Sequence, residues 1–193
     1  MGTPDPRFAR AHDALVAGMT ALLDERPLHE VTVTELVARS GVSRPTFYQH
    51  CGGSIGTLAA ESALVRLRAV FPPEPAGRDD SPAVVRAEAR ALLADLVSHL
   101  DRHRAFYLRV LDGAPTLELQ GALVDLLREQ TAEKSPLRDA VDFAGTRVTV
   151  VHAGMVWFLM DWLRADEPGR EPAEAVVERL VRVLMEEFFG PSS

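Results

Sequence analysis

The sequence predicts an all-α protein of about nine helices, and this fold class rests on three observations. Alanine, leucine, arginine and glutamate are abundant along the 193 residues, and all four favour helix. Apolar residues recur at the three- and four-residue spacing of helices, whereas no stretch alternates as a half-buried strand does. Prolines and glycines gather between the periodic segments and mark the turns. A chain of this length can bury a proper core as one large domain or two small ones.

Four helices are expected before the clearest linker, Phe71–Pro82, whose prolines, glycine and charges exclude a packed element. The first helix spans Arg7–Arg26 and ends at Pro27. The second and third form a pair within Thr32–His50. The fourth spans Thr57–Val70 and leads into the remainder of the chain.

The segment Thr32–His50, TVTELVARSGVSRPTFYQH, predicts two short helices joined by a tight turn. Apolar residues at i, i+3 and i+4 give the first helix one apolar face, and Thr34 is the expected N-cap before Glu35. Gly41 is expected to end this helix, because glycine adopts the left-handed conformation after a helix without steric penalty.

The second helix of the pair, Arg44–His50, is too short and too polar to exist for packing alone. Ser43 is its expected N-cap, Pro45 is tolerated in its first turn, and Phe47 is its expected anchor. The other side chains are expected to point outward, where their chemistry suits base edges and phosphates. The segment therefore predicts a helix-turn-helix whose second member is a recognition helix. The expected base readers are Arg44, Thr46 and Gln49.

This run of residues resembles the DNA-binding signature of the TetR family of transcriptional repressors. The most specific elements are G-V-S followed in the same frame by T-F-Y-x-H. The family pattern continues with a phenylalanine and then a loop lysine that grips phosphate, where this chain has Cys51 and Ser54. By the resemblance, Thr34, Tyr48 and His50 contact phosphates. The complete predicted DNA-binding set is Thr34, Ser43, Arg44, Pro45, Thr46, Tyr48, Gln49 and His50.

The resemblance implies a three-helix DNA-binding domain over residues 1–55, joined by the fourth helix to a ligand-binding and dimerisation domain over residues 56–193. It also implies a transcriptional regulator that is released from double-stranded operator DNA by a small-molecule effector. The five helices expected in the body are Ala83–Arg102, Ala105–Leu111, Thr116–Lys134, Leu137–Arg164 and Ala173–Phe189.

A homodimer is expected, because one recognition helix of seven residues reads too few base pairs to be specific. Two such helices related by a two-fold axis would read an inverted repeat. The helix expected at Leu137–Arg164 is apolar nearly all round from Val148 onward, so it must be covered on several sides. With the last helix it could form a four-helix seam with its symmetry mate. The predicted interface residues are Val176, Leu180, Val183, Leu184 and Phe188.

An effector pocket is expected in the body, because a body of five helices is larger than a dimerisation seam needs and bodies of this family generally hold such a pocket. Methionine and aromatic side chains concentrated in one region suit an adaptable apolar cavity, although core packing explains much of such a stripe. The expected ligand is largely hydrophobic with one or two hydrogen-bonding groups. The predicted lining is Leu96, His99, His103, Tyr107, Leu123, Leu127, Met155, Trp157 and Phe158.

The formal net charge of −7 is unevenly distributed along the chain. Residues 1–70 hold seven Lys/Arg and seven Asp/Glu, so the whole excess of negative charge follows them. The acidic remainder of the chain repels DNA, whereas the neutral residues 1–70 do not, and this difference favours specific over non-specific binding. The same acidity favours a neutral or cationic effector over a strongly anionic one.

Reactive groups that could converge on a substrate are few, so we expect no enzyme, no cofactor and no metal site. His99 and His103 are four residues apart, as metal ligands can be, but the flanking arginines would oppose a cation. The alternative is a small-molecule-binding or catalytic helical protein whose helix-turn-helix head has lost operator binding. The departures from the family pattern at Cys51 and Ser54 keep this alternative open.

A cytoplasmic protein with no membrane partner is expected from three further features. Cys51 is the one cysteine, which excludes an intramolecular disulfide and suits a reducing compartment. The N-terminus has no apolar core of a signal peptide. The most hydrophobic stretch, Val148–Leu163, is shorter than the roughly 20 residues of a bilayer crossing.

Overall fold

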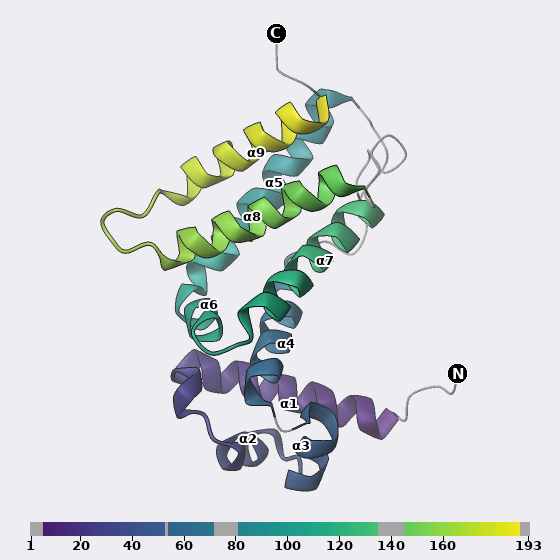
Figure 1. The fold of residues 1–193 in the computed structure, drawn as a ribbon, viewed down its shortest axis with the longest axis vertical. Coiled ribbons are helices and arrows are strands. Elements are labelled where there is room, and N and C mark those ends of the chain that lie inside the picture. The colour runs from purple at the N-terminus through teal and green to yellow at the C-terminus, as the bar shows by residue number, and fades with distance from the viewer. Residues whose placement is uncertain (1–5, 53, 72–80, 135–144, 190–193) are drawn as a thin grey trace. The chain divides into compact units, whose positions relative to one another are not determined.

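The computed structural model describes residues 6–52, 54–71, 81–134 and 145–189, and every regular element in these ranges is helical (Figure 1). The all-α fold class predicted from the sequence is confirmed. No helix within these ranges is both long and apolar enough to cross a membrane. In chain order the elements are α1 (Pro6–Glu25), the 3₁₀ turn η1 (Leu28–Glu30), α2 (Val33–Ser40), α3 (Arg44–Cys51), α4 (Ile55–Arg68), α5 (Pro82–Arg102), α6 (Arg104–Leu111), α7 (Thr116–Lys134), α8 (Thr146–Arg164) and α9 (Ala173–Phe189).

The helices group into two compact units. Unit 1 falls within Met1–Arg66 and Ala105–Leu119, so it combines α1, α2, α3 and most of α4 with most of α6. Unit 2 falls within Leu67–Arg104 and Gln120–Ser193 and contains α5, α8, α9 and most of α7. Helix α6 thus joins the helix-turn-helix pair in space although five helices precede it in the chain.

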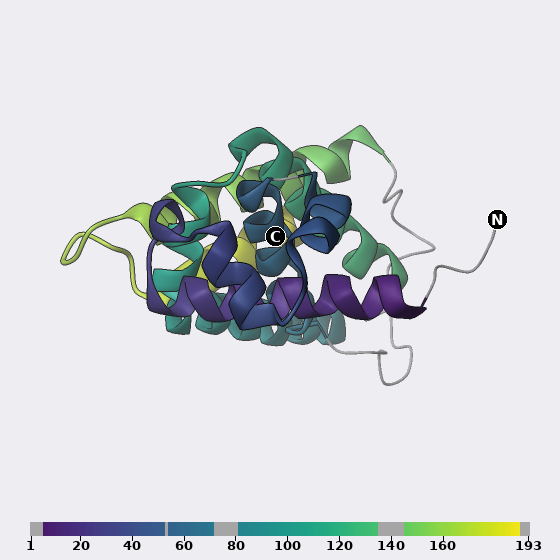
Figure 2. The ribbon, with the colours of Figure 1, turned by 90° about the horizontal axis from the view of Figure 1, so that it is seen from below.

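Helices α2 and α3 pack on α1 at the centre of unit 1 (Figures 1 and 2). A glycine permits the close approach of α1 to α2, since a Cβ added at Gly18 would stand 3.2 Å from the Cβ of Ser40. Each leucine or phenylalanine buried in this core contributes about 1.5–3 kcal/mol. The side chains at most 2% exposed are Leu15, Met19, Leu22, Leu23, Leu36 and Phe47.

Two arginines join α6 to α1 and α4 within unit 1. The Arg109 guanidinium donates to the carbonyl oxygen of Leu23, near the end of α1, at 2.7 Å. Arg66 of α4 donates to both carboxylate oxygens of Asp24 at 2.7 and 3.2 Å, and its guanidinium lies 4.4 Å from the centre of the Phe106 ring. Helix α6 therefore has a defined place in the unit that carries the helix-turn-helix pair.

Unit 2 is organised by the packing of α5 on α9. The Arg104 guanidinium donates to the carbonyl oxygens of Leu163 and Ala165 at 2.9 and 3.0 Å, which satisfies acceptors left open at the end of α8. The Trp162 indole donates to the carbonyl oxygen of Glu171 at 2.7 Å and ties the following loop to the same helix. The buried apolar side chains of α5 and α9 are Val85, Leu93, Leu96, Val97, Leu100, Val176, Val177, Leu180, Val181 and Met185.

Most predicted helix boundaries lie within two residues of the observed ones, but α8 begins later than predicted. The predicted start was Leu137, whereas α8 begins at Thr146 because Gly145 before it is extended, with φ −70° and ψ 157°. Residues 137–144 of the predicted helix lie outside the described residues, as does most of the predicted linker Phe71–Pro82.

Candidate nucleic-acid interface

Helix α2 is fixed at its start by a capping box between Thr32 and Glu35. The Glu35 N–H donates to Thr32 Oγ1 at 3.2 Å, and the Thr32 N–H donates to Glu35 Oε2 at 3.1 Å. The prediction that Thr34 caps this helix is wrong, because the box requires a threonine three residues before the glutamate. Thr34 is instead an exposed residue inside the helix.

The turn between the two helices is formed by Gly41 and Ser43, as predicted. Gly41 has φ 68° and ψ 11°, a left-handed conformation in which a β-carbon would be unfavourable. Ser43 is the N-cap of α3, because its Oγ accepts the Thr46 N–H at 3.3 Å, and Pro45 lies in the first turn. Short-range chemistry therefore determines where α2 ends and α3 begins.

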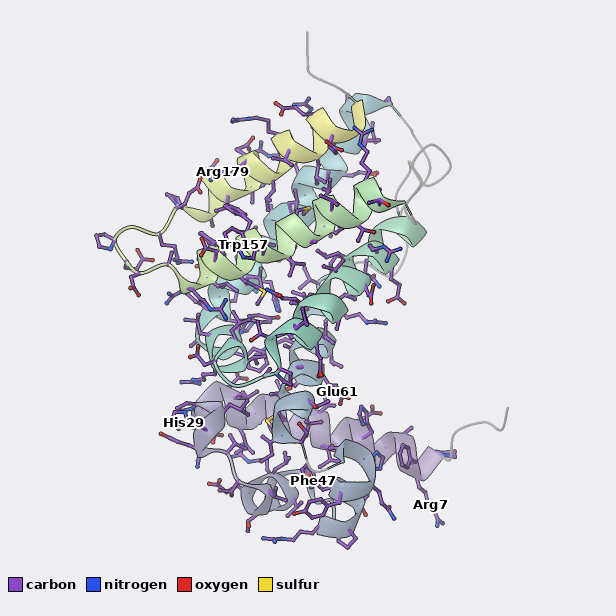
Figure 3. The ribbon with its side chains drawn as sticks, in the orientation of Figure 1. Arg7, His29, Phe47, Glu61, Trp157 and Arg179 are labelled. Carbon is purple, nitrogen blue, oxygen red and sulfur yellow. The ribbon has the colours of Figure 1, made fainter. Side chains whose placement is uncertain are left out.

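Helix α3 has a single buried side chain, Phe47, which has no exposed surface (labelled in Figure 3). Arg44, Pro45 and Gln49 are exposed, and Tyr48 retains 53% of its surface. One anchor therefore leaves most of the helix free for contact with another molecule. Of the predicted DNA-binding residues in or before α3, those exposed are Ser43, Arg44, Pro45, Tyr48 and Gln49, and those half-buried are Thr46 and His50.

Arg44 and Thr34 meet on the exposed side of the pair although they belong to different helices. The Arg44 Nη2 donates to Thr34 Oγ1 at 2.5 Å. Because a hydroxyl carries no charge, the guanidinium keeps its positive charge for a base edge or a phosphate. The Ser43 and Thr46 hydroxyls lie 2.8 Å apart and are hydrogen-bonded to each other, so the Thr46 hydroxyl already has a partner in the DNA-free chain.

His50, predicted to contact phosphate, packs against α1. Its ring stacks on that of Phe8, with 3.7 Å between centroids and 27° between planes, and the His12 ring lies 5.8 Å away. Burial and, to a lesser degree, the charge of His12 lower the pKa of His50. The ring is therefore neutral at physiological pH and would meet a phosphate only as a neutral hydrogen-bond donor.

Two arginines close to the pair are bound to carboxylates of the same unit. Arg39 donates to both carboxylate oxygens of Glu25 at 2.8 and 3.0 Å, and Arg26 donates to Glu35 at 2.6 Å. The hydrogen bonds from Arg39 lower the pKa of Glu25. These ion pairs neutralise two of the positive charges within residues 1–70, whereas Arg44 is hydrogen-bonded to a neutral hydroxyl.

The residues after α3 differ from the family pattern, in which the resemblance implies a lysine that binds phosphate. In this chain they end α3 and cap the start of α4. Gly52 ends α3 at φ 55°, and its N–H donates to the carbonyl oxygen of Tyr48. The Oγ of Ser54 accepts the Thr57 N–H at 3.1 Å in the first turn of α4. Cys51 is half-buried and burial raises the pKa of its thiol, so it is a protonated packing group rather than a reactive thiolate.

The residues predicted to line an effector pocket fall in both units. Tyr107 belongs to unit 1 and is buried, whereas the other eight belong to unit 2. The His99 and His103 rings are 4.7 Å apart between centroids. Trp157 is 62% exposed, so its indole is on the surface of the chain (Figure 3). Of the others, Leu96, Leu127 and Met155 are buried, and His99, His103, Leu123 and Phe158 are half-buried.

Within the part of the chain that the structure describes, no group of three or more His, Cys, Asp or Glu side chains is placed to hold a metal ion. The buried polar residue of α8, His152, is 3% exposed, and burial lowers its pKa.

The predicted dimer-interface residues on α9 occupy different environments. Val176 and Leu180 are 0% and 4% exposed, because they face the interior of unit 2 where α5 packs on α9. These two residues therefore belong to the core of unit 2. Val183 is 46% exposed and Leu184 is half-buried. The side chain of Phe188 lies outside the described residues.

An exposed stripe of small and apolar residues runs along α8. Val150 and Trp157 are 64% and 62% exposed, and Ala153 and Gly154 between them are exposed as well. The spacing i, i+3, i+4 and i+7 puts all four residues on one face of the helix. We call this face the α8 stripe. It explains why the sequence of this helix is apolar nearly all round: one side is core, and another is an exposed apolar surface.

Comparison with known proteins begins with the helix-turn-helix segment. Residues 15–53 match the family model described as bacterial regulatory proteins, tetR family. Among solved structures, the chain is similar to a TetR transcriptional regulator from Rhodococcus sp. RHA1, with 17% identity and a TM-score of 0.67 over 94% of this chain and 98% of that chain. It also aligns with the TetR family repressor AlkX from Dietzia sp. strain DQ12-45-1b, implicated in biodegradation of n-alkanes, with 17% identity and a TM-score of 0.48 over 96% and 98% of the two chains. No curated protein sequence matches the chain significantly.

The segment that matches the family model contains both helices of the pair and the part of α1 on which they pack. The similarity to the Rhodococcus regulator extends the shared fold over nearly the whole chain. Residues 15–53 therefore match a helix-turn-helix segment of the tetR family, and nearly the whole chain shares its fold with a solved TetR transcriptional regulator.

Proposed function

We propose that the chain is a transcriptional repressor of the TetR family that binds an inverted-repeat operator as a homodimer and is released by a small, largely hydrophobic effector. Residues 1–55 act as the DNA-binding domain and residues 56–193 as the ligand-binding and dimerisation domain in this proposal. The observation that carries it is α3, in which Phe47 alone is buried while the polar side chains of Arg44, Tyr48 and Gln49 are exposed. A helix selected for packing would bury a whole stripe.

The proposed contacts divide into base readers and phosphate contacts. Arg44 and Gln49 are exposed on α3. Arg44 has the paired donors that read guanine in the major groove, and Gln49 has the donor and acceptor that read adenine. Thr46 is the third proposed reader, through its methyl group as well as its hydroxyl. Tyr48 and Thr34 are exposed hydroxyls suited to phosphate oxygens, which position the helix without reading sequence.

The proposed dimer forms through the α8 stripe. Trp157 is the largest side chain on that face, and aromatic residues dominate the energetics of subunit interfaces. Val183 and Leu184 of α9 add apolar surface beside it in the proposed seam. A two-fold axis through this seam would present two copies of α3 to half-sites about one helical turn of DNA, or a multiple of it, apart.

The proposed effector site lies in unit 2, where apolar side chains supply most of the contact and the neighbouring His99 and His103 supply polar points. The excess of Asp and Glu after residue 70 favours a neutral or cationic effector. An effector releases DNA only by preferring the conformation that does not bind it, and about 3 kcal/mol of preference lowers operator affinity roughly 150-fold. By reciprocity, operator DNA must weaken effector binding by the same factor.

Selection of duplexes from a random pool tests the proposed function directly. The wild-type chain is expected to enrich one inverted repeat. On that sequence Arg44→Ala should lose about 1–3 kcal/mol of binding free energy and relax the preference at one base pair in each half-site. Arg39→Ala is the matched control, because its guanidinium is bound to Glu25 and should read no base.

The two ways in which this experiment can fail are distinct. If the wild-type chain enriches no sequence, it does not act through an operator, and the alternative of a body with an inactive head gains support. If a sequence is enriched but Arg44→Ala retains full selectivity, the chain binds DNA through another face of α3.

A further inference from the structure

A hydrogen bond between Arg44 and Thr34 connects the first turns of the two helices of the helix-turn-helix pair. Thr34 is the second residue of α2, and Arg44 is the first residue of α3. Arg44 Nη2 donates to Thr34 Oγ1 at 2.5 Å, and both side chains are exposed. The backbone under each of them is fixed by a cap, through Thr32 in α2 and Ser43 in α3. What the hydrogen bond adds is therefore a defined orientation of the long guanidinium side chain.

The partner of Arg44 is a neutral hydroxyl, which can orient a guanidinium without neutralising it. Arg39 shows the other arrangement, since both oxygens of Glu25 accept from it and balance its charge. Thr34 takes up one of the five N–H donors of Arg44 and leaves four, enough for a bidentate contact with guanine. The positive end of the helix dipole disfavours a cation at the first residue of α3, so helix stability does not explain Arg44. The arrangement instead suits an oriented and fully charged base reader.

Orientation before binding matters because an arginine that rotates freely must be ordered when it meets a base. That ordering lowers affinity and selectivity, since a mobile guanidinium can reach several acceptors. The β-branched side chain of Thr34 is stiff about χ1, which makes its oxygen a fixed acceptor. The hydroxyl keeps its own proton while it accepts from Arg44, so it can still donate to a phosphate oxygen. One atom thus connects the base reader to the DNA backbone.

We propose that Thr34 is a positioning residue for base selection, whose hydroxyl holds the Arg44 guanidinium in the orientation that reads its base pair. The inference rests on the proposed operator binding and deepens it. It gives Thr34 an effect on sequence preference, whereas a phosphate contact alone weakens binding to all sequences equally.

Discrimination at a single base pair tests this role. The base pair in question is the one at which Arg44→Ala relaxes the preference. Binding is measured by gel shift to the enriched operator and to a duplex changed at that base pair in one half-site, and the ratio of the two affinities is the discrimination. Thr34→Val keeps the shape of the side chain and removes the hydroxyl. It should lower the discrimination about two- to tenfold, because one arginine side chain must then be ordered on binding.

Two further variants separate positioning from other effects. Thr34→Ser retains the hydroxyl and should restore the discrimination of the wild type. In an Arg44→Ala background, Thr34→Val should leave the discrimination unchanged, because no guanidinium remains to be oriented.

Several results would overturn the inference. Wild-type discrimination in Thr34→Val would leave Thr34 at most a phosphate contact. An equal loss with and without Arg44 would show that Thr34 does not act through it, and an equal loss at base pairs unaffected by Arg44→Ala would indicate a displaced α3. If Arg44→Ala relaxes no base pair, the inference fails while operator binding stands. Failure of the wild-type chain to enrich any duplex instead overturns the proposed function, and the inference with it.

Discussion

Helices α3 and α8 are held in place in opposite ways. Of the eight residues of α3, only Phe47 is buried, and the helix is fixed by that anchor and by caps at both ends. Helix α8 buries side chains along its whole length, from Val148 to Leu163. In each helix the informative residues are those that packing does not explain. These are the exposed polar side chains of α3 and the exposed apolar residues of the α8 stripe.

The largest effect is expected when α3 loses Phe47, its single buried anchor. Phe47→Ala should lower the free energy of unfolding by about 3–5 kcal/mol, because a fully buried aromatic ring leaves a cavity. Operator binding should be lost with it. Leu159→Ala in α8 removes a buried side chain among many and should lower stability while the folded protein keeps its operator affinity. Urea unfolding and a gel-shift titration measure both quantities. If Phe47→Ala and Leu159→Ala lose the same operator affinity per folded molecule, the anchor of α3 has no special role in DNA binding.

The next effect concerns the α8 stripe. Trp157→Glu places a charge in the proposed seam and should weaken dimerisation by about 2 kcal/mol or more, roughly a 30-fold rise in the dissociation constant of the dimer. Leu117→Glu is the matched control, because Leu117 is an apolar residue outside the stripe that is 82% exposed. Sedimentation equilibrium should show a monomer for the first variant and the wild-type state for the second. A dimer that persists in Trp157→Glu would place the interface elsewhere.

A smaller effect separates stability from recognition within α2. Thr32→Ala removes the side chain that closes the capping box and should cost about 0.5–2 kcal/mol of stability. Thr34→Ala should leave the unfolding curve nearly unchanged and weaken operator binding, because Thr34 is exposed and bonded to Arg44. If the two variants lose stability equally, the cap has been assigned to the wrong threonine.

The smallest effect is a pH dependence that differs between the two regions. Burial lowers the pKa of both His50 and His152, and His152 is the more deeply buried. A histidine in the unfolded chain titrates near about 6.5, so below that pH the unfolded chain binds more protons and the free energy of unfolding falls as pH falls. One such group contributes at most about 1.4 kcal/mol per pH unit. His152→Phe should flatten the dependence between about pH 6.5 and 5 more than His50→Phe does, as measured by urea unfolding at each pH.

The sequence sufficed for the features that local chemistry determines. Gly41 and Ser43 fix the turn because their conformational and capping preferences act over a few residues. The threonine that caps α2 could also have been identified, since Thr32 and Glu35 have the T-x-x-E spacing of a capping box. The start of α8 was misplaced because apolar periodicity does not show that Gly145 is extended.

Features that depend on contacts between distant residues could not be predicted. Periodicity gives α9 one wide apolar stripe, and only the packing of α5 shows that Val176 and Leu180 lie inside the chain while Val183 lies outside. The pairing of Phe8 with His50 likewise depends on how α1 crosses α3, which no local pattern specifies. For the same reason a count of charges in the head could not show which arginines are already bound to carboxylates.

In the proposed function each chain offers one recognition helix, and two chains joined through the α8 stripe are needed to read an operator. The most direct test is the mass of the protein–DNA complex by sedimentation velocity, on the enriched inverted repeat and on a duplex that contains only one half-site. We expect two chains on the full repeat and a large loss of affinity on the half-site. A single chain bound to the half-site as tightly as to the full repeat would contradict the proposed function.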